Sequence, residues 1–238
     1  MHLCSSNGLR RKILLGSLVI LLLGPDHEFC SCVDAQNLDN VSSSNLVNQM
    51  KAKLSGGDLF GAVPLLNEFK KRVKDGEFKG VNLEKIDYFI GLGYMTGYSA
   101  SRDKNLLKKA TDQFEHYIKI YPNGGDIHYV LLNKVDCHRG TGDFKGAIVT
   151  LKALLAQPYI SRLRIKERID SMEKLVQAYY FEQMWDEGIP WFEKFLKITH
   201  DKEKKTMAAA ALTEAYVAKE KFEKIEALLP HLNTNTKS

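Results

Sequence analysis

The chain has 238 residues, of which 44% are hydrophobic and 26% charged, and a formal net charge of +5 at pH 7. Roughly 200 residues follow a targeting segment at the N-terminus, which is enough for one well-buried domain. Basic and acidic residues are interspersed, as in Lys202-Glu203-Lys204-Lys205. This predicts a solvated surface of mixed charge rather than a basic stripe, and it argues against nucleic acid as a partner.

The N-terminus has the three parts of a secretory signal peptide in their usual order. A basic patch at 10–12 precedes an uncharged apolar run at 13–23, and Val33-Asp34-Ala35 follows as a cleavage site. We therefore predict a signal peptide over 1–35, cut after Ala35, and export to the periplasm or cell envelope. The alternative is an uncleaved signal that tethers the protein to a membrane, although the run is shorter than the about 20 residues that span a bilayer.

The cysteine pattern excludes an internal disulfide in the mature chain. Of the four cysteines, Cys4, Cys30 and Cys32 precede the predicted cut, and only Cys137 follows it. One cysteine can neither form an internal disulfide nor build a zinc site by itself. We expect Cys137 to be a small buried residue on the apolar face of a helix.

After a polar linker at 36–45, a helical pattern of apolar residues continues almost to the C-terminus. It divides into five helix pairs, separated by turns rich in Gly, Asp and Pro. The predicted pairs are 46–54 with 59–73, 83–96 with 105–121, 127–139 with 144–156, 164–181 with 186–198, and 205–218 with 221–229. Residues 98–104 are expected to form a polar loop, Pro230 to end the last helix, and 233–238 to be a disordered tail.

The clearest pair lies within 175–196. Its first helix has apolar residues at spacings of three and four, and its second helix repeats this with Trp185, Ile189, Phe192 and Phe195. Neither helix can bury its apolar stripe alone, so the two must pack on each other and on neighbouring pairs. We expect Trp185 and Phe192 to lie at the contact between the two helices.

Several pairs have small and aromatic residues at equivalent positions. These are Ile90-Gly91-Leu92-Gly93-Tyr94 with Ala110, Phe114 and Tyr117, Gly142-Asp143-Phe144 with Ala147 and Leu151, Ala178-Tyr179 with Gly188 and Phe192, and Ala215-Tyr216 with Phe222. The pattern resembles the tetratricopeptide repeat (TPR), a helix-turn-helix unit of about 34 residues. The resemblance implies an all-α fold over 46–232, a right-handed α-solenoid of about five antiparallel helix pairs.

The chain departs from the TPR pattern at three places. Lys53 replaces the first-helix tyrosine of the first pair, and Asp87 stands where the second pair usually has an aromatic residue. Ile225 replaces the small residue of the last pair. Because a bulky residue keeps the two helices apart there, we expect the last repeat to splay or to act as a cap.

No pattern of residues indicates catalysis or a bound cofactor. Gly91, Gly93 and Gly97 lie in a helix with no preceding strand, so helix packing explains them better than a dinucleotide fingerprint. The histidines are spread over separate repeats without the spacing of a metal site, and no nucleophile elbow is present. We predict that the protein is not an enzyme and uses no metal or cofactor.

In TPR arrays the first helix of each pair lines the concave groove, and the resemblance implies which side chains point into it. The candidate partner-binding residues are Tyr88, Tyr129, Asp136, Arg139, Glu173, Gln177, Tyr180 and Glu214. Tyrosines among a few charges suit a peptide or a partner helix, because aromatic residues anchor and charges orient. Ordinary solvated helix faces have a similar composition. The Lys/Asn clamp with which chaperone-binding members hold a C-terminal carboxylate is absent.

The leading hypothesis is an exported scaffold that binds a protein or peptide partner through its concave groove. The alternative is a structural spacer or an assembly subunit of an envelope complex, which packs through its terminal repeats. A third, remote hypothesis is a carbohydrate- or lipid-handling enzyme, which would require a carboxylate pair or metal cluster that the sequence does not contain.

Overall fold

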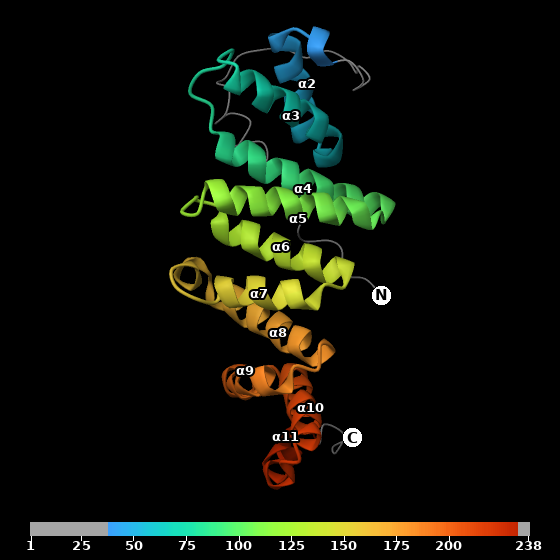
Figure 1. Ribbon diagram of the computed structural model, residues 1–238, viewed down its shortest axis with the longest axis vertical. Coiled ribbons are helices and arrows are strands. Elements are labelled where there is room, and N and C mark those ends of the chain that lie inside the picture. Colours follow the sequence, from blue (N-terminus) through green and yellow to red (C-terminus); the bar gives the residue numbers. More distant parts are fainter. Residues whose placement is uncertain (1–37, 233–238) are drawn as a thin grey trace. The chain divides into compact units, whose positions relative to one another are not determined.

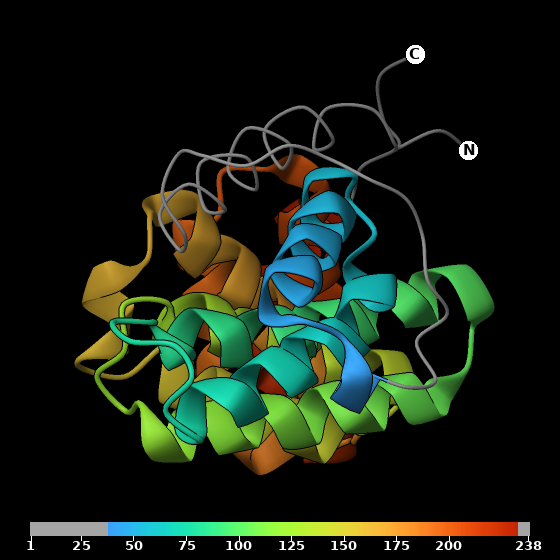
Figure 2. The same ribbon diagram turned by 90° about the horizontal axis from the view of Figure 1, so that it is seen from above.

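The computed structural model describes residues 38–232, and every regular element in this range is a helix (Figures 1 and 2). None of the helices within that range is long and apolar enough to cross a membrane. The described chain divides into two compact units between Gly124 and Gly125. The predicted signal peptide 1–35, its cleavage after Ala35 and the predicted tail 233–238 lie outside the described residues.

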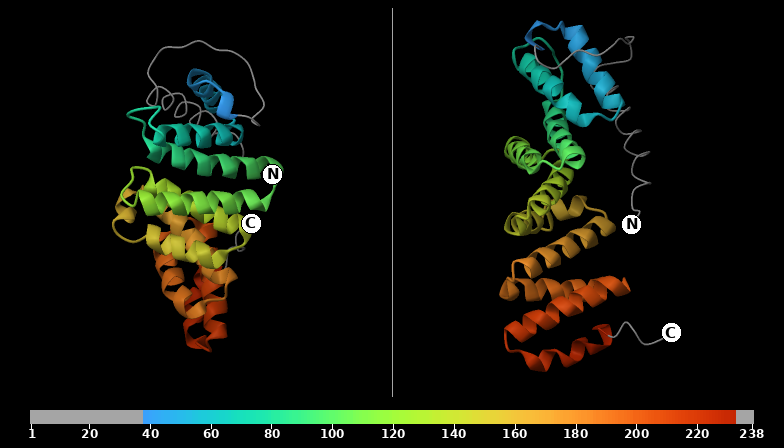
Figure 3. Two further views of the ribbon diagram at one scale, coloured as in Figure 1. Left: turned by 45° about the horizontal axis from the view of Figure 1, so that its top comes forward. Right: turned by 90° about the vertical axis from the view of Figure 1, so that its right-hand side faces the viewer.

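Each unit is built from helices that pack against their neighbours in sequence. The first unit contains η1 (Leu38–Asn40), α2 (Ser43–Ser55), α3 (Leu59–Lys74), α4 (Leu83–Ser101) and α5 (Lys104–Ile120). The second unit contains α6 (Ile127–Thr141), α7 (Phe144–Leu154), η2 (Tyr159–Arg162), α8 (Ile165–Phe181), α9 (Trp185–Ile198), α10 (Lys202–Ala218), η3 (Phe222–Lys224), η4 (Glu226–Leu228) and α11 (Leu229–Leu232). The right panel of Figure 3 shows the successive reversals of α8, α9 and α10. The predicted all-α fold of antiparallel helix pairs is confirmed.

Aspartates in the turns fix where two second helices begin. The Asp58 side chain accepts a hydrogen bond from the backbone N–H of Gly61 (2.8 Å), and Asp143 accepts one from Gly146 (2.9 Å). The first N–H groups of a helix have no partner within the helix, so an aspartate at this position satisfies one of them. α3 and α7 therefore start directly after the Gly-Asp turns that the sequence shows.

The glycines of α4 allow close packing on both α3 and α5. A Cβ atom added at Gly91 would lie 2.3 Å from Phe114 of α5, and one added at Gly93 would lie 2.3 Å from Val63 of α3. Gly97 meets an α3 side chain in the same way. A larger residue at Gly93 would collide with the α3 backbone, and one at Gly91 with the buried Phe114 ring. Helix packing, the predicted role of these glycines, is confirmed.

The contact between α8 and α9 forms a central part of the second unit's core. Phe192 and Tyr179 are completely buried. Gly188 permits the close crossing, because a Cβ atom added there would lie 3.1 Å from the Cβ of Tyr179. Trp185 lies edge-on to Tyr180 of α8, with ring centroids 5.9 Å apart. Trp185 thus packs on α8 and Phe192 is buried, as expected for two residues at the contact between these helices.

α4 is longer than the sequence predicts. It continues to Ser101, through residues expected to form a polar loop. The hydroxyl groups of Ser99 and Ser101 donate to the carbonyls of Met95 and Gly97, four residues earlier (3.2 and 2.9 Å). These polar side chains are therefore satisfied within the helix. Arg102, in the left-handed region with a φ of 61°, ends it.

The last pair lacks the second helix that was predicted over 221–229. The chain forms the short elements η3, η4 and α11 instead, and Pro230 lies inside α11 rather than ending a helix. These elements pack on α10. Ile225, which aligns with Ala147 of the third pair, lies between η3 and η4. The last repeat therefore ends in short irregular elements on α10, which we call the irregular cap.

Candidate functional site

In the second unit, α6, α8 and α10 are the first helices of three successive pairs, and their side chains contact one another directly. We call the side chains that make these contacts the first-helix face. Its members are Asp136, Arg139, Asp170, Glu173, Lys174, Gln177, Tyr180, Lys204, Met207 and Glu214. Every predicted groove residue of this unit except Tyr129 belongs to it.

Two polar contacts join α6 to α8. Lys174 Nζ lies 2.6 Å from Asp136 Oδ1, and Arg139 Nη2 donates to Gln177 Oε1 at 2.9 Å. Both contacts join residues that are 38 positions apart. The contact made at one turn of α6 and α8 is therefore followed by another at the next turn, so the two helices keep the same register along this face.

Further contacts join α8 to α10. Lys204 Nζ lies 2.6 Å from Glu173 Oε2 and 3.3 Å from Asp170 Oδ1. The hydrogen bond to Glu173 raises the pKa of Lys204. The Tyr180 hydroxyl donates to Glu214 Oε1 at 2.8 Å, and this bond raises the pKa of Tyr180. Both tyrosine and lysine are thus held in their protonated forms by carboxylates of neighbouring helices.

Gln177 links all three first helices. Its Oε1 accepts from Arg139 of α6, and its Nε2 points to the sulfur of Met207 in α10 at 3.6 Å. The two contacts fix the orientation of the amide. A thioether is a weak acceptor, so the Nε2 donor is poorly satisfied.

The remaining predicted groove residue of this unit, Tyr129, has 41% of its surface exposed. Its ring packs on that of His128, with centroids 4.0 Å apart. Burial lowers the pKa of His128. Tyr129 is on α6 like Asp136 and Arg139, but it takes no part in the cross-links of the first-helix face.

Tyr88, the eighth predicted groove residue, belongs to the first unit. Its ring lies 5.9 Å from that of Phe89 and 6.4 Å from those of Phe114 and Tyr117. It therefore packs among the aromatic side chains of α4 and α5. The other seven predicted residues belong to the second unit.

The sequence interpretation missed Lys174 and Lys204, the two lysines of the face. Each lies one repeat away from an aspartate, because Asp136 and Lys174 are 38 residues apart and Asp170 and Lys204 are 34 apart. Two residues of opposite charge, separated by about one repeat on successive first helices, can indicate an ion pair between those helices. Groove positions read from a single helix do not contain this signal, because it joins two helices.

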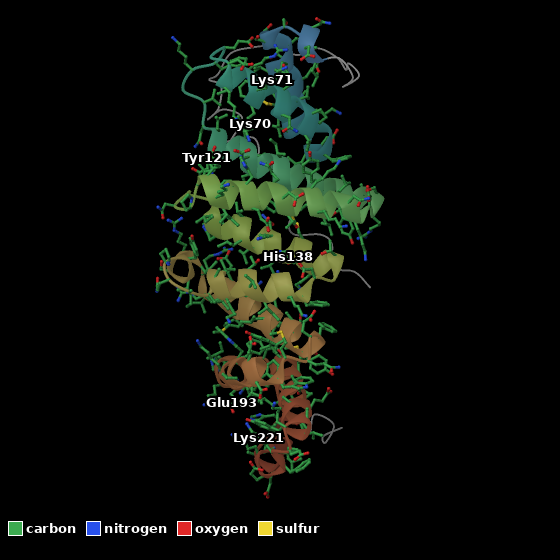
Figure 4. The ribbon with its side chains drawn as sticks, viewed as in Figure 1. Lys70, Lys71, Tyr121, His138, Glu193 and Lys221 are labelled. Carbon is green, nitrogen blue, oxygen red and sulfur yellow. The ribbon has the colours of Figure 1, made fainter. Side chains whose placement is uncertain are left out.

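The first unit contains a second polar cluster, around the buried Asp87 of α4. Lys70 of α3 pairs with its carboxylate, and Gln113 of α5 donates to it at 2.8 Å. The Tyr121 hydroxyl donates to it at 3.3 Å, and burial, with the charge of Asp87, raises the pKa of Tyr121 to about 12. Figure 4 labels Lys70 and Tyr121. The cluster ties three helices together and replaces the aromatic packing of a typical repeat.

Across the part of the chain that the structure describes, no group of three or more His, Cys, Asp or Glu side chains could hold a metal ion. Cys137 is a buried free cysteine, as predicted. His138 Nδ1 lies 2.7 Å from Asp143 Oδ2. Because Asp143 also caps α7, this pair secures the turn between α6 and α7. Figure 4 labels His138.

Comparisons with known proteins found no matching family model and no matching curated protein. Among solved structures, the chain is similar to a Podosopora anserina protein named for kinesin light chain, with nearly identical TPR-like repeats. The identity is 16%, the TM-score is 0.48, and the match covers 77% of this chain and 90% of that one. A variant of the same protein matches at 17% identity and a TM-score of 0.48, covering 77% of this chain and 89% of that one. Both are described as having nearly identical TPR-like repeats.

Proposed function

We propose that this chain is an exported helical-repeat scaffold that holds a protein or peptide partner on the first-helix face of its second unit. The observation that carries the proposal is the set of side-chain contacts between α6, α8 and α10. Side chains that are already ordered lose less conformational entropy when a partner binds. The face is therefore suited to binding without prior rearrangement.

Tyr180 is the anchor that we assign to this face. Its ring lies 6.0 Å from Phe181 and 5.9 Å from Trp185, and its hydroxyl is held by Glu214. Rigid aromatic side chains contribute most to binding, whereas charges at the rim chiefly affect orientation and association rate. Since Glu173 is already paired with Lys204, we expect its contribution to be smaller than that of the Tyr180 ring.

The test measures recovery of the crosslinked partner from envelope extract with wild type, Tyr180→Ala, Tyr180→Phe and Glu173→Ala. We expect Tyr180→Ala to weaken capture at least about tenfold. Tyr180→Phe keeps the ring and should retain most of the capture, as should Glu173→Ala. Circular dichroism checks that each variant is folded. Unchanged recovery with all three variants would remove the first-helix face as the binding site.

The second candidate function is that of an assembly subunit or spacer that packs through its terminal repeats. It is favoured by the exposed apolar residues of the irregular cap, because Phe222 is 60% exposed and Leu229 is 49% exposed. This candidate predicts that Phe222→Ala or Leu229→Ala abolishes recovery while Tyr180→Ala does not. The same extract and crosslinking protocol thus separates the two functions.

The exported location rests on the N-terminal sequence. The order of a basic patch at 10–12, an apolar run at 13–23 and a small-residue site ending at Ala35 supports entry into the secretory route. Export would place the first-helix face in the periplasm or at the cell envelope. Retention of the signal as a membrane tether is the alternative location.

A further inference from the structure

The first-helix face contains three cationic side chains, and two of them are already neutralised. Lys174 lies 2.6 Å from Asp136, and Lys204 lies 2.6 Å from Glu173. Arg139 has no carboxylate partner within residues 38–232. Its guanidinium donates a hydrogen bond to the neutral amide oxygen of Gln177, at 2.9 Å.

This arrangement leaves the Arg139 guanidinium with an uncompensated positive charge. The side chain is only half-buried, and a guanidinium has several N–H donors in a planar fork, of which one is used here. The Gln177 amide holds the fork in place without neutralising it. Arg139 is therefore oriented by the fold and still able to bind an anion.

Gln177 supplies a second donor beside the first. Its Nε2 has the thioether sulfur of Met207 as its acceptor, at 3.6 Å. A carboxylate oxygen is a much stronger acceptor than a thioether. An incoming carboxylate would thus gain a guanidinium from α6 and an amide N–H from α8, while the Arg139–Gln177 contact could persist.

We propose that Arg139 and Gln177 bind the side-chain carboxylate of an Asp or Glu in the partner segment. This inference rests on the proposed function, because it concerns the same face. An internal acidic side chain fits better than a C-terminal carboxylate. A C-terminal carboxylate is usually bound by several cationic side chains at once. Both lysines of this face already form ion pairs, with Asp136 and Glu173.

The experiment selects a phage-displayed random dodecapeptide library on the purified full chain and on its Arg139→Glu variant. We expect the wild type to enrich peptides with Asp or Glu at one fixed position, and Arg139→Glu to lose that preference or replace it with Lys or Arg. The best peptide is then made with Glu and with Gln at that position. Both forms are titrated by calorimetry against wild type, Arg139→Gln, Lys174→Gln and Tyr180→Ala.

For the acidic peptide, Arg139→Gln should weaken binding about 10- to 100-fold, which is the range for a charge-assisted hydrogen bond. The Gln peptide should bind wild type and Arg139→Gln alike. Lys174→Gln, the matched control, removes the same charge from a compensated pair and should weaken binding far less. Higher salt should weaken the acidic peptide more than the neutral one.

The outcomes distinguish the two levels of the proposal. Selected peptides that lose affinity with Tyr180→Ala, but carry no fixed acidic residue or bind Arg139→Gln unchanged, overturn the carboxylate site and leave the proposed face intact. Arg139 would then only stabilise the C-terminal end of α6, where the helix dipole favours a cation. Peptides that are insensitive to Tyr180→Ala, or a selection that enriches none, contradict both proposals.

Discussion

Replacing Lys70 with methionine tests whether the buried ion pair of the first unit holds α3 against α4. The Asp87 side chain is 1% exposed and that of Lys70 is 15% exposed, so water cannot take over the role of the lysine. Methionine keeps most of the volume of the lysine stem while removing the ammonium group. The substitution therefore leaves a buried carboxylate without its cation and creates little empty space.

The expected loss follows from what remains around Asp87. Removing one partner of a buried pair costs about 3–5 kcal/mol of unfolding free energy, because the other charge stays buried. Gln113 at 2.8 Å and the Tyr121 hydroxyl at 3.3 Å still donate to the carboxylate, and His116 Nε2 lies 3.9 Å from it. We therefore expect the lower end of the range, about 3 kcal/mol. Adding Asp87→Leu to Lys70→Met removes the stranded charge and should recover most of the loss.

The measurement is urea unfolding combined with hydrogen exchange. Both tryptophans, Trp185 and Trp191, lie in the second unit, so their fluorescence should report no change, while exchange in α3, α4 and α5 should accelerate. Lys71→Met is the matched control, since Lys71 is on the same helix but its pair with Asp39 is exposed, and it should have no measurable effect. Equal effects of the two substitutions would refute the reasoning about burial.

Three further predictions concern other parts of the chain. Phe192→Ala should cost about 3–5 kcal/mol because Phe192 is fully buried, and hydrogen exchange should accelerate in α8 and α9 while the first unit stays unchanged. N-terminal sequencing of protein from the native host should find a mature terminus at or near Gln36, and an intact Met1 on a cytosolic protein would contradict export. Burial lowers the pKa of His128, so its protonation favours the unfolded chain. Wild type should therefore lose stability relative to His128→Gln as the pH falls below about 6.5, and equal urea midpoint shifts between pH 7 and pH 5 would exclude this contribution.

The sequence predicted the helix pairs well because their signals are local. The Gly-Asp turn before Phe144 includes the aspartate that caps the next helix. The apolar stripe of α9 likewise determines which face of that helix is buried. The errors arose where composition is ambiguous. Ser99 and Ser101 are typical of loops, yet each satisfies its hydroxyl within α4. Residues 221–229 have helical composition, but they form short irregular elements on α10 instead.

For the candidate site, the helical period predicted which side chains lie on one face of each first helix. It did not predict which side chains of neighbouring helices contact each other. Arg139 and Gln177 were both assigned to one surface, and the structure adds that they bond to each other. That contact depends on how far α6 and α8 are offset along their axes. Loop lengths and core packing between the pairs set this offset, and neither can be derived from the helical period of the sequence. Tyr88 shows the same limit, because its position in the repeat does not reveal the aromatic neighbours around it.

The contacts of the first-helix face also constrain how a partner can bind. The Tyr180–Glu214 hydrogen bond joins α8 to α10. A ligand that accepted a hydrogen bond from this hydroxyl would have to provide Glu214 with another donor. The same holds for a ligand group that displaced Lys174 from Asp136. Binding costs least where the face has unused capacity, which is at the ring of Tyr180 and at the uncompensated charge of Arg139. A partner that combines contact with this ring and a carboxylate for Arg139 can therefore bind without breaking the Lys174–Asp136 or Tyr180–Glu214 contacts between the helices.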